Sequence, residues 1–170
     1  MKALVVIFLL ASSAFAADNP QLANATAACG PKDAKFSVSK APGQPTMPQA
    51  EPGKAIVYVI EDPKWNGFVP PTTRVGLDGA WVGANRGKTY IVFSVSAGEH
   101  HLCTDWPRVL GKRSVAVAKL DAEQGKIYYF RARVASYRGS HDILDLDSID
   151  VDQAQLLMAS AGRSKSQLKK

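Results

Sequence analysis

Three histidines are the side chains of this 170-residue chain that first suggest chemistry. His100 and His101 are adjacent, so in a strand their rings point to opposite faces and cannot easily bind one metal ion together. His141 lies further along the chain, next to Asp142. A zinc site normally needs histidines or thiolates at closer spacing. We therefore expect structural or surface histidines, with no bound metal or cofactor.

A string of aspartates near the carboxyl end could instead bind calcium. Its members are Asp142, Asp145, Asp147, Asp150 and Asp152. The central glycine and terminal glutamate of an EF-hand loop are missing. Local roles are also available, because Asp145 and Asp147 can pair with arginines and Asp150 can cap a helix. These roles argue against a calcium site.

Nucleophilic and acid–base catalysis find little support in the spacing of polar residues. The chain has no Gly-x-Ser-x-Gly elbow, and we predict that the stretch Arg138 to His141 is a loop. Nothing marks two carboxylates that face each other, as a glycosidase would need. We expect a protein that is not an enzyme, with an uncharacterised extracytoplasmic hydrolase as an alternative.

Two cysteines, Cys29 and Cys103, are the whole thiol content of the chain. An even count in an exported protein predicts a disulfide bridge. The bridge would close the long loop between Cys29 and Cys103, and it would contribute roughly 4 kcal/mol of stability. The competing interpretation is a reactive Cys103 with His101, two residues away, as its base. We favour the bridge.

Aromatic residues could form a strip on which a sugar or peptide stacks. The candidates are Trp65, Trp81, Trp106, Tyr90 and Tyr137. The competing interpretation, which we favour, makes two of the three tryptophans supports for the core or for a hairpin. If an aromatic binding surface does exist, its candidate residues are Trp65, Trp106, Tyr137 and His101, and the corresponding alternative function is a carbohydrate-binding module.

The elements that must position these residues are predicted to be short strands. Ile56 to Ile60 is almost continuously apolar, as in a buried strand, and Asp78-Gly79 is a strong hairpin signal between Arg74–Leu77 and Ala80–Gly83. A two-residue turn there places Gly76 opposite Trp81, where the indole supports the glycine. The same turn places Leu77 opposite Ala80 and Val75 opposite Val82.

Two further pairings follow from the alternation of side chains. A second hairpin at Ala97-Gly98 would pair Phe93 with Leu102 and Val95 with His100. The strands 115–120 and 127–134 follow, joined around Gly125. A turn centred on Gly139 would pair opposite charges on one face of the hairpin and apolar side chains on the other. Its four pairs are Arg133 with Asp145, Arg131 with Asp147, Val134 with Leu144, and Ala132 with Leu146.

One short helix near the carboxyl end completes the predicted fold. Asp150 can cap it, Gln153 occupies the capping-box position, and Val151, Ala154 and Met158 form an apolar stripe. The pattern predicts an all-β chain, a small antiparallel β-sandwich with a short C-terminal helix. Its expected segments are a Pro/Ala-rich extended arm at 17–53, the sandwich with its helix at 54–160, and a basic disordered tail at 161–170. A short edge strand is expected over 35–39.

The first sixteen residues are typical of a bacterial-type secretory signal peptide. Lys2 precedes the apolar run Ala3 to Leu10, and Ala14-Phe15-Ala16 suits cleavage before Ala17. No cysteine follows closely, so lipid attachment is not expected, and no later segment is long and apolar enough to span a membrane. We expect a soluble protein in the periplasm or the extracellular medium.

The formal net charge of +6 is concentrated at the two ends of the chain. Between Ala17 and Ser160, 16 Lys and Arg face 15 Asp and Glu, which leaves a nearly neutral body. A basic tail can contact anionic lipid, cell-wall polymer or nucleic acid. We interpret it instead as a solvated, frayed terminus and expect no nucleic-acid partner.

Four motifs in the sandwich region occur in a fixed order, at residues 54–59, 75–83, 97–102 and 125–131. They comprise a first strand, the Asp-Gly hairpin, a Gly-x-His-x-Leu pattern that uses His100, and a Gly-Lys-x-Tyr-Tyr pattern. In this order the stretch Gly53 to Leu146 resembles a family of secreted or lipid-anchored bacterial domains of unknown function. It is also similar to PEGA-type surface β-sandwich repeats. The resemblance implies the fold and an envelope location but no activity. Our leading hypothesis is a non-catalytic domain that binds a protein or a cell-envelope polymer.

Overall fold

The computed structural model describes residues 27–43, 48–64, 69–107, 114–135 and 143–169, and every structural statement below concerns these residues. The predicted signal peptide and its cleavage site lie outside them. No helix in these ranges is long and apolar enough to cross a membrane.

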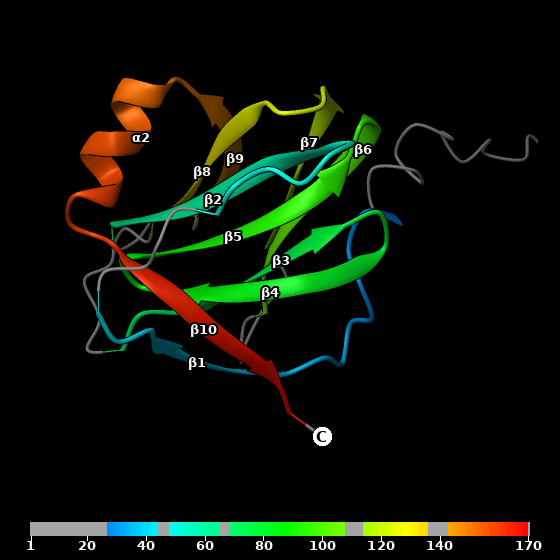
Figure 1. Cartoon of the computed structure of the whole chain (residues 1–170). Helices are drawn as coiled ribbons and strands as arrows, with labels where there is room; N and C mark the ends of the chain where they lie inside the picture. The colour runs from blue at the N-terminus through cyan, green and yellow to red at the C-terminus, as the bar shows by residue number, and fades with distance from the viewer. Residues whose placement is uncertain (1–26, 44–47, 65–68, 108–113, 136–142, 170) are drawn as a thin grey trace, which may run out of the picture.

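The described chain forms two sheets that pack face to face, with one helix at the side (Figure 1). The larger sheet has the strand order β1-β10-β5-β2-β8-β9, and the smaller has the order β4-β3-β6-β7. The larger sheet comprises β1 (Phe36–Lys40), β2 (Lys54–Lys64), β5 (Thr89–Ser96), β8 (Ile127–Ala135), β9 (Ile143–Ile149) and β10 (Gly162–Leu168). The smaller comprises β3 (Thr72–Leu77), β4 (Ala80–Arg86), β6 (Gly98–Trp106) and β7 (Ser114–Ala122), and the helix is α2 (Val151–Met158). The predicted β-sandwich with a short C-terminal helix is confirmed.

The larger sheet is mixed, whereas the smaller one is wholly antiparallel. β2 runs parallel to β8, and β10 runs parallel to β5. The chain leaves the larger sheet after β2 and again after β5. Each time it returns only after passing through two strands of the smaller sheet.

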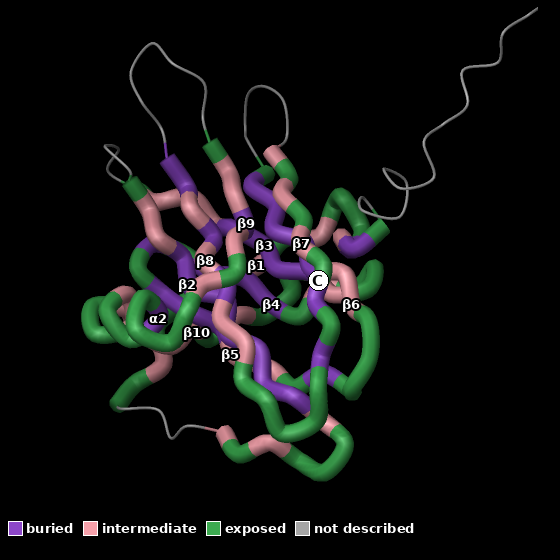
Figure 2. The backbone as a smooth tube through the Cα atoms, turned by 90° about the horizontal axis from the view of Figure 1, so that it is seen from above, coloured by how far each residue is buried: buried purple, intermediate pink, exposed green. Residues whose placement is uncertain are grey.

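β2 is buried on both faces, which explains its nearly continuous apolar sequence. Val57 and Val59 point into the main core between the sheets, together with Leu102 and Phe130. The alternate residues Ile56, Tyr58 and Ile60 face a second cluster, which α2 covers with Ala154. Figure 2 shows this buried centre between exposed margins.

The Asp-Gly hairpin forms as predicted, except for one bulge. Gly76 lies opposite Trp81 and Leu77 opposite Ala80, and both turn residues have positive φ, 49° at Asp78 and 87° at Gly79. The predicted pairing of Val75 with Val82 is wrong, because the register shifts between Val75 and Gly76 and Val75 lies opposite Gly83. An extra residue on one strand is the usual form of a bulge.

The predicted second hairpin at Ala97-Gly98 is wrong, because β5 and β6 belong to different sheets. β5 pairs with β2 and β10, and β6 pairs with β3 and β7. The connection is a corner, with φ of 132° at Gly98 and a hydrogen bond from Ala97 N to Gly53 O. Val95 and Leu102 nevertheless share the core, because they meet across the sandwich.

The register of β8 against β9 is confirmed at all four predicted pairs, for example Arg131 with Asp147 and Ala132 with Leu146. Asp150 caps α2 and accepts a hydrogen bond from Gln153 N at 2.8 Å. Ala154 and Met158 pack inward as expected, but Val151 is exposed because it lies at the first position of the helix.

The predicted disordered tail is a strand. β10 pairs with the whole length of β1, from Phe36 opposite Leu168 to Lys40 opposite Ser164, and the edge strand expected at 35–39 is β1. Two serines attach β10 to the smaller sheet. Ser164 Oγ donates to Ala84 O at 2.6 Å, and Ala84 N donates to Ser166 Oγ at 3.1 Å. The two serine hydroxyls thus form hydrogen bonds with the backbone of Ala84 in β4, where an adjacent strand would normally use its own backbone groups.

Candidate functional site

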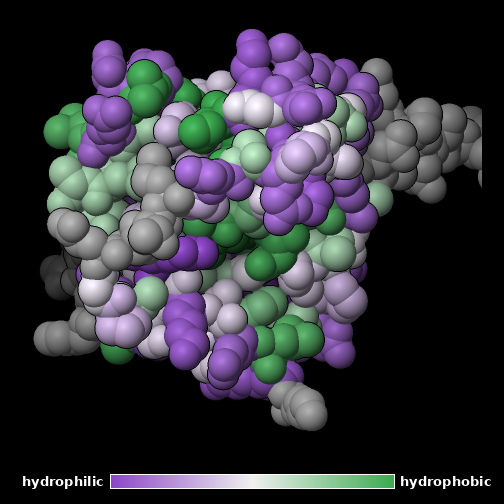
Figure 3. All heavy atoms as spheres, in the orientation of Figure 1, coloured by the Kyte–Doolittle hydropathy of each residue, from purple (hydrophilic) through white to green (hydrophobic). Residues whose placement is uncertain are grey.

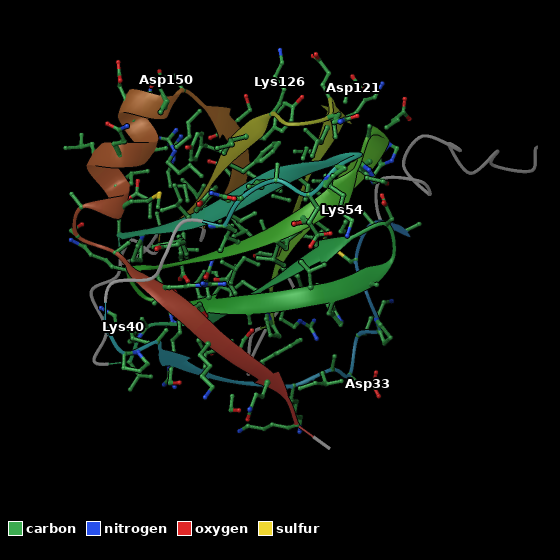
Figure 4. All side chains as sticks on the ribbon, viewed as in Figure 1. Asp33, Lys40, Lys54, Asp121, Lys126 and Asp150 are labelled. Carbon is green, nitrogen blue, oxygen red and sulfur yellow. A yellow bond between two sulfur atoms is a disulfide. The ribbon has the colours of Figure 1, made fainter. Side chains whose placement is uncertain are left out.

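The pairing of β1 with β10 gathers positive charge on one two-stranded unit. We call residues 35–41 and 162–169 the basic ribbon. It contains five cationic residues and no Asp or Glu, and its members with charge are Lys35, Lys40, Arg163, Lys165 and Lys169. Figure 4 labels Lys40 at one end of the ribbon and Asp33, the nearest acid in the sequence, beyond its other end. Charges from opposite ends of the chain therefore act on one surface.

Side chains of the ribbon alternate strictly between its two faces. Inward positions such as Val38, Ser164 and Ser166 are half-buried against β4. Outward positions are exposed, and they carry ammonium, amide or hydroxyl groups: Lys35, Ser37, Ser39, Lys165, Gln167 and Lys169. Figure 3 shows hydrophilic residues along β10 on this face of the molecule. The outward face is built of hydrogen-bond donors without a carboxylate.

A shallow depression of about 220 Å³ lies on this ribbon. Its lining residues come from both strands: Ser37, Val38, Ser39, Lys165 and Gln167. Ser37 Oγ donates to Gln167 O at 3.4 Å, so the hydroxyl bridges the two strands at the middle of the depression. Hydroxyl, amide and ammonium groups here can each bind an anionic oxygen.

A second cavity of about 340 Å³ lies at the end of the ribbon where Lys35 and Lys169 meet. Lys169 N donates to Lys35 O at 2.8 Å, which holds the two cationic residues side by side. We call this cavity the cationic pocket. It is lined by Lys32, Asp33, Ala34, Lys35, Phe36, Thr72, Arg74, Pro107 and Lys169. The ribbon thus continues into a pocket with both cationic and apolar walls.

Arg74 holds the wall of the cationic pocket in place. Its Nη1 donates to Lys32 O at 2.9 Å and to Ala34 O at 2.6 Å, and its Nη2 donates to the carboxylate of Asp105. The guanidinium carbon also lies 4.5 Å from the ring centroid of Trp81. One buried cation therefore joins β3, β6 and the segment before β1.

The predicted disulfide fixes the start of the same segment. Cys29 and Cys103 are bonded, which rules out the reactive-thiol interpretation of Cys103. Trp81 lies over this attachment, as its Nε1 donates to Pro31 O at 2.9 Å. A Cβ at Gly30 would lie 2.6 Å from the indole, and one at Gly76 would lie 2.8 Å from Ala28 O. Both glycines are needed for this close approach.

The structure contradicts one member of the binding surface proposed from the sequence, Trp106. Trp106 is 6 % exposed, so its assignment to a binding surface is wrong; it ends β6 on the inner side of the fold. Tyr90 is also buried, and Trp81 has the structural role expected of it. Trp65 and Tyr137 lie outside the described residues. His101 is half-exposed, with Glu99 4.0 Å from its Nε2.

His100 bridges the Asp-Gly turn and the corner between the sheets. Its Nδ1 lies 2.6 Å from Asp78 Oδ2 and its Nε2 2.9 Å from Ser96 O. Burial alone would lower the pKa of His100, but the bonds to Asp78 and Ser96 outweigh it and raise the pKa. Burial would likewise raise the pKa of Asp78, and the bonds from His100 and from the His101 N–H reverse this and lower it. Because both ring nitrogens face acceptors, the charged imidazolium fits this position.

Glu61 is a buried acid at the far end of β2. Burial raises its pKa well above the ordinary value, against hydrogen bonds from Thr73 and from the Gly87 backbone that favour the charged form. Thr73 Oγ1 lies 3.4 Å from Glu61 Oε1, and Oε2 has no hydrogen-bond partner among the described residues. Asn85 and Thr89 continue this polar cluster, with Asn85 Nδ2 donating to Val59 O. The cluster is enclosed between the sheets, so it has a structural role.

The aspartates near the carboxyl end are engaged in local structure. Asp147 pairs with Arg131 and Arg133 at 3.4 Å, and Asp150 caps α2. Asp142 and His141 lie outside the described residues. No group of three or more His, Cys, Asp or Glu side chains that could hold a metal ion occurs within the described ranges.

Comparisons with known proteins add no relative: no protein-family model, no curated protein and no solved structure matches the chain. The resemblance to a secreted-domain family therefore stays a prediction from its four motifs.

The basic ribbon is not predicted from the sequence. A signal was present in Ser164-Lys165-Ser166-Gln167, which alternates between small hydroxyl residues and long polar ones. Strand patterns are usually recognised by apolar residues at every second position. Here the inward positions are serines that bond to the backbone of β4, so both faces of β10 look polar in the sequence.

Proposed function

We propose that this chain is a non-catalytic binding domain that works outside the cytoplasm and holds an anionic cell-envelope polymer on the basic ribbon. The observation that carries the proposal is the ribbon itself: two distant segments with five cationic residues and no acid, whose exposed outward face carries Lys35, Lys165 and Lys169. A surface of one charge sign attracts the opposite charge over several ångströms and raises the rate of encounter.

Some cations elsewhere on the described surface offer less to a polyanion. Lys119 is 2.8 Å from Glu99 and 3.4 Å from Asp121, and Lys126 is 3.3 Å from Glu123, so these cations are neutralised by neighbours. Within the described residues, no ion pair joins a ribbon cation to an acid. The exposed lysines of the ribbon therefore offer a polymer more charge than Lys119 and Lys126 do.

An extended partner fits the ribbon better than a compact one. The outward row runs the whole length of β10, and the depression and the cationic pocket follow one another along it. The donors are hydroxyl, amide and ammonium groups, which suit the oxygen atoms of a hydrated polymer. Stacking on aromatic rings would need exposed tryptophans, and the described tryptophans Trp81 and Trp106 are engaged in the fold.

The extracytoplasmic location is supported by the signal-like amino terminus and by the disulfide, which persists in oxidising compartments. The non-catalytic assignment is supported by the structural roles of the polar groups. Asp105 is paired with Arg74, and Asp78 with His100.

Charge reversal on the ribbon tests the proposal. Titration of the protein with a polyanion such as dextran sulfate, at low and high salt, should show binding that weakens steeply as salt increases. The double variant Lys165→Glu/Lys169→Glu should lose this binding. The matched control Lys119→Glu/Lys126→Glu makes the same charge change on β7 and the following turn, and it should bind within about twofold of the unmodified protein. Equal losses in both variants, or turnover of an ester, glycoside or peptide by the purified protein, would contradict the proposal.

A further inference from the structure

The outward face of β10 places a nitrogen donor at every second residue. Lys165, Gln167 and Lys169 are exposed at these positions, and Arg163 is half-buried at the start of the row, while Ser164 and Ser166 between them point toward β4. Two residues of a strand advance by roughly 6.6 Å. The row is therefore a ladder of donors with one fixed repeat.

β1 supplies a second row beside the first. Ser37 lies opposite Gln167 and Ser39 opposite Lys165, and Lys35 is joined to Lys169 by a backbone hydrogen bond. Each step of the ladder thus has a nitrogen donor on β10, and three of its steps have a hydroxyl or ammonium group on β1. Phosphate oxygens accept bonds from ammonium and hydroxyl donors together.

We propose that the ribbon recognises a polyol-phosphate polymer, that is, a chain of short polyols joined by phosphodiesters, with one phosphate on each step of the ladder. A phosphodiester with a three-carbon linker repeats after the same number of backbone bonds as two residues of an extended peptide, so the two repeats match. This inference rests on the proposed function and names the chemical class of its ligand.

Two other polyanions fit the ladder less well. Single-stranded nucleic acid is also a phosphodiester, but its bases are normally held by aromatic side chains, and none of the outward positions is aromatic. A polyuronate carries its carboxylates on rigid sugar rings, whose repeat is set by the ring rather than by an extended chain. The ladder offers hydroxyls to a polyol linker and a charge or an amide to each phosphate.

The test compares ligands of matched total charge by isothermal titration calorimetry on the full mature chain. The ligands are poly(glycerol phosphate), polygalacturonate, oligo(dT) and dextran sulfate. We expect poly(glycerol phosphate) to bind about tenfold or more tightly than each of the others. Lys165→Gln should weaken that binding and lower the slope of log K against log salt by about one.

Lys126→Gln is the matched control, because Lys126 lies outside the ribbon, in the turn before β8, where its Nζ is 3.3 Å from Glu123 Oε2. It should change the affinity by no more than about twofold. Far-ultraviolet circular dichroism and thermal melting establish that both variants fold. If all four polyanions bind equally and the two variants behave alike, the inference is overturned while the proposed function stands. If no polyanion binds, both fail; tighter binding of oligo(dT) or polygalacturonate overturns the inference in favour of that ligand.

Discussion

Arg74 and Asp105 lie opposite each other on β3 and β6 and form an ion pair whose side chains are only 2 % and 0 % exposed. The same guanidinium bonds to the carbonyls of Lys32 and Ala34. A buried pair of this kind adds little net stability by itself, since desolvation offsets the attraction. Its effect here is positional, because it fixes the segment that leads into β1 and forms one wall of the cationic pocket.

Removal of one partner should be costly. Asp105→Asn leaves a buried guanidinium without its counter-charge, and we expect the free energy of unfolding to fall by about 3 to 5 kcal/mol. Urea denaturation followed by tryptophan fluorescence measures this change. The control is Asp145→Asn, which removes the partner of the partly exposed Arg133 and should cost under about 1 kcal/mol. Similar losses in the two variants would show that Arg74 is not held as described.

The serines of β10 should each matter more than their exposure suggests. Ser166→Ala removes the acceptor for Ala84 N, and Ala84 is fully buried. An unsatisfied buried N–H costs about 1 to 3 kcal/mol, which thermal and urea unfolding can measure. Ser37→Ala is the control, because Ser37 faces outward on the neighbouring strand and bonds only weakly to Gln167 O. A neutral Ser166→Ala would contradict the attachment of β10 to β4.

Glu61 should make the protein less stable as the pH rises. Its pKa is raised by burial, so between the ordinary value of 4.5 and the raised value the native state holds a proton that the unfolded state has lost. The free energy of unfolding therefore falls with increasing pH, by at most about 1.4 kcal/mol per pH unit for one proton. Glu61→Gln should remove this slope in urea titrations above pH 5. Equal slopes in the variant and the unmodified protein would show that Glu61 is ionised in the native state.

His100 should contribute a second decrease in the free energy of unfolding with rising pH, which begins at a higher pH than that of Glu61. Its pKa is raised above 6.5, so its contribution is complete below that pH and is lost as the pH rises through the raised value. Asp78 has a lowered pKa and contributes above 3.8, with loss as the pH falls through the lowered value. Asp78→Asn should shift the imidazole titration of His100, followed by nuclear magnetic resonance, to lower pH. An unchanged titration would contradict the bond between His100 and Asp78.

Local signals in the sequence were sufficient for some elements and not for others. The Asp-Gly turn predicts the pairing of β3 with β4, apart from the bulge. The Arg–Asp pairs predict the register of β8 against β9, because a single register pairs opposite charges on one face and apolar residues on the other. The bridge between Cys29 and Cys103 followed from the cysteine count. Ala97-Gly98 was misassigned because a two-residue connection suits either a hairpin or a corner between sheets. The choice depends on which strands lie beside β5, and that is long-range information.

The candidate site was harder to predict, for a physical reason. The ribbon pairs residues 36–40 with residues 164–168, and neither segment has an apolar face that would reveal a strand. Its inward serines bond to the backbone of Ala84 in β4, which is distant in the sequence, so no local pattern predicts this contact. The sequence suggests a surface position for Trp106 only because aromatic side chains can stack on a sugar or peptide. Its burial depends on the packing of the sandwich.

The binding role of the basic ribbon is tested most directly by amide hydrogen exchange with and without an anionic envelope polymer such as poly(glycerol phosphate). We expect slower exchange at the backbone amides of 36–40 and 163–169 in the presence of the polymer. Amides in β7 and in the Asp-Gly turn should exchange at unchanged rates. Protection elsewhere on the sandwich with none in these two segments would show that the partner binds another surface, and that the paired ends of the chain serve the fold alone.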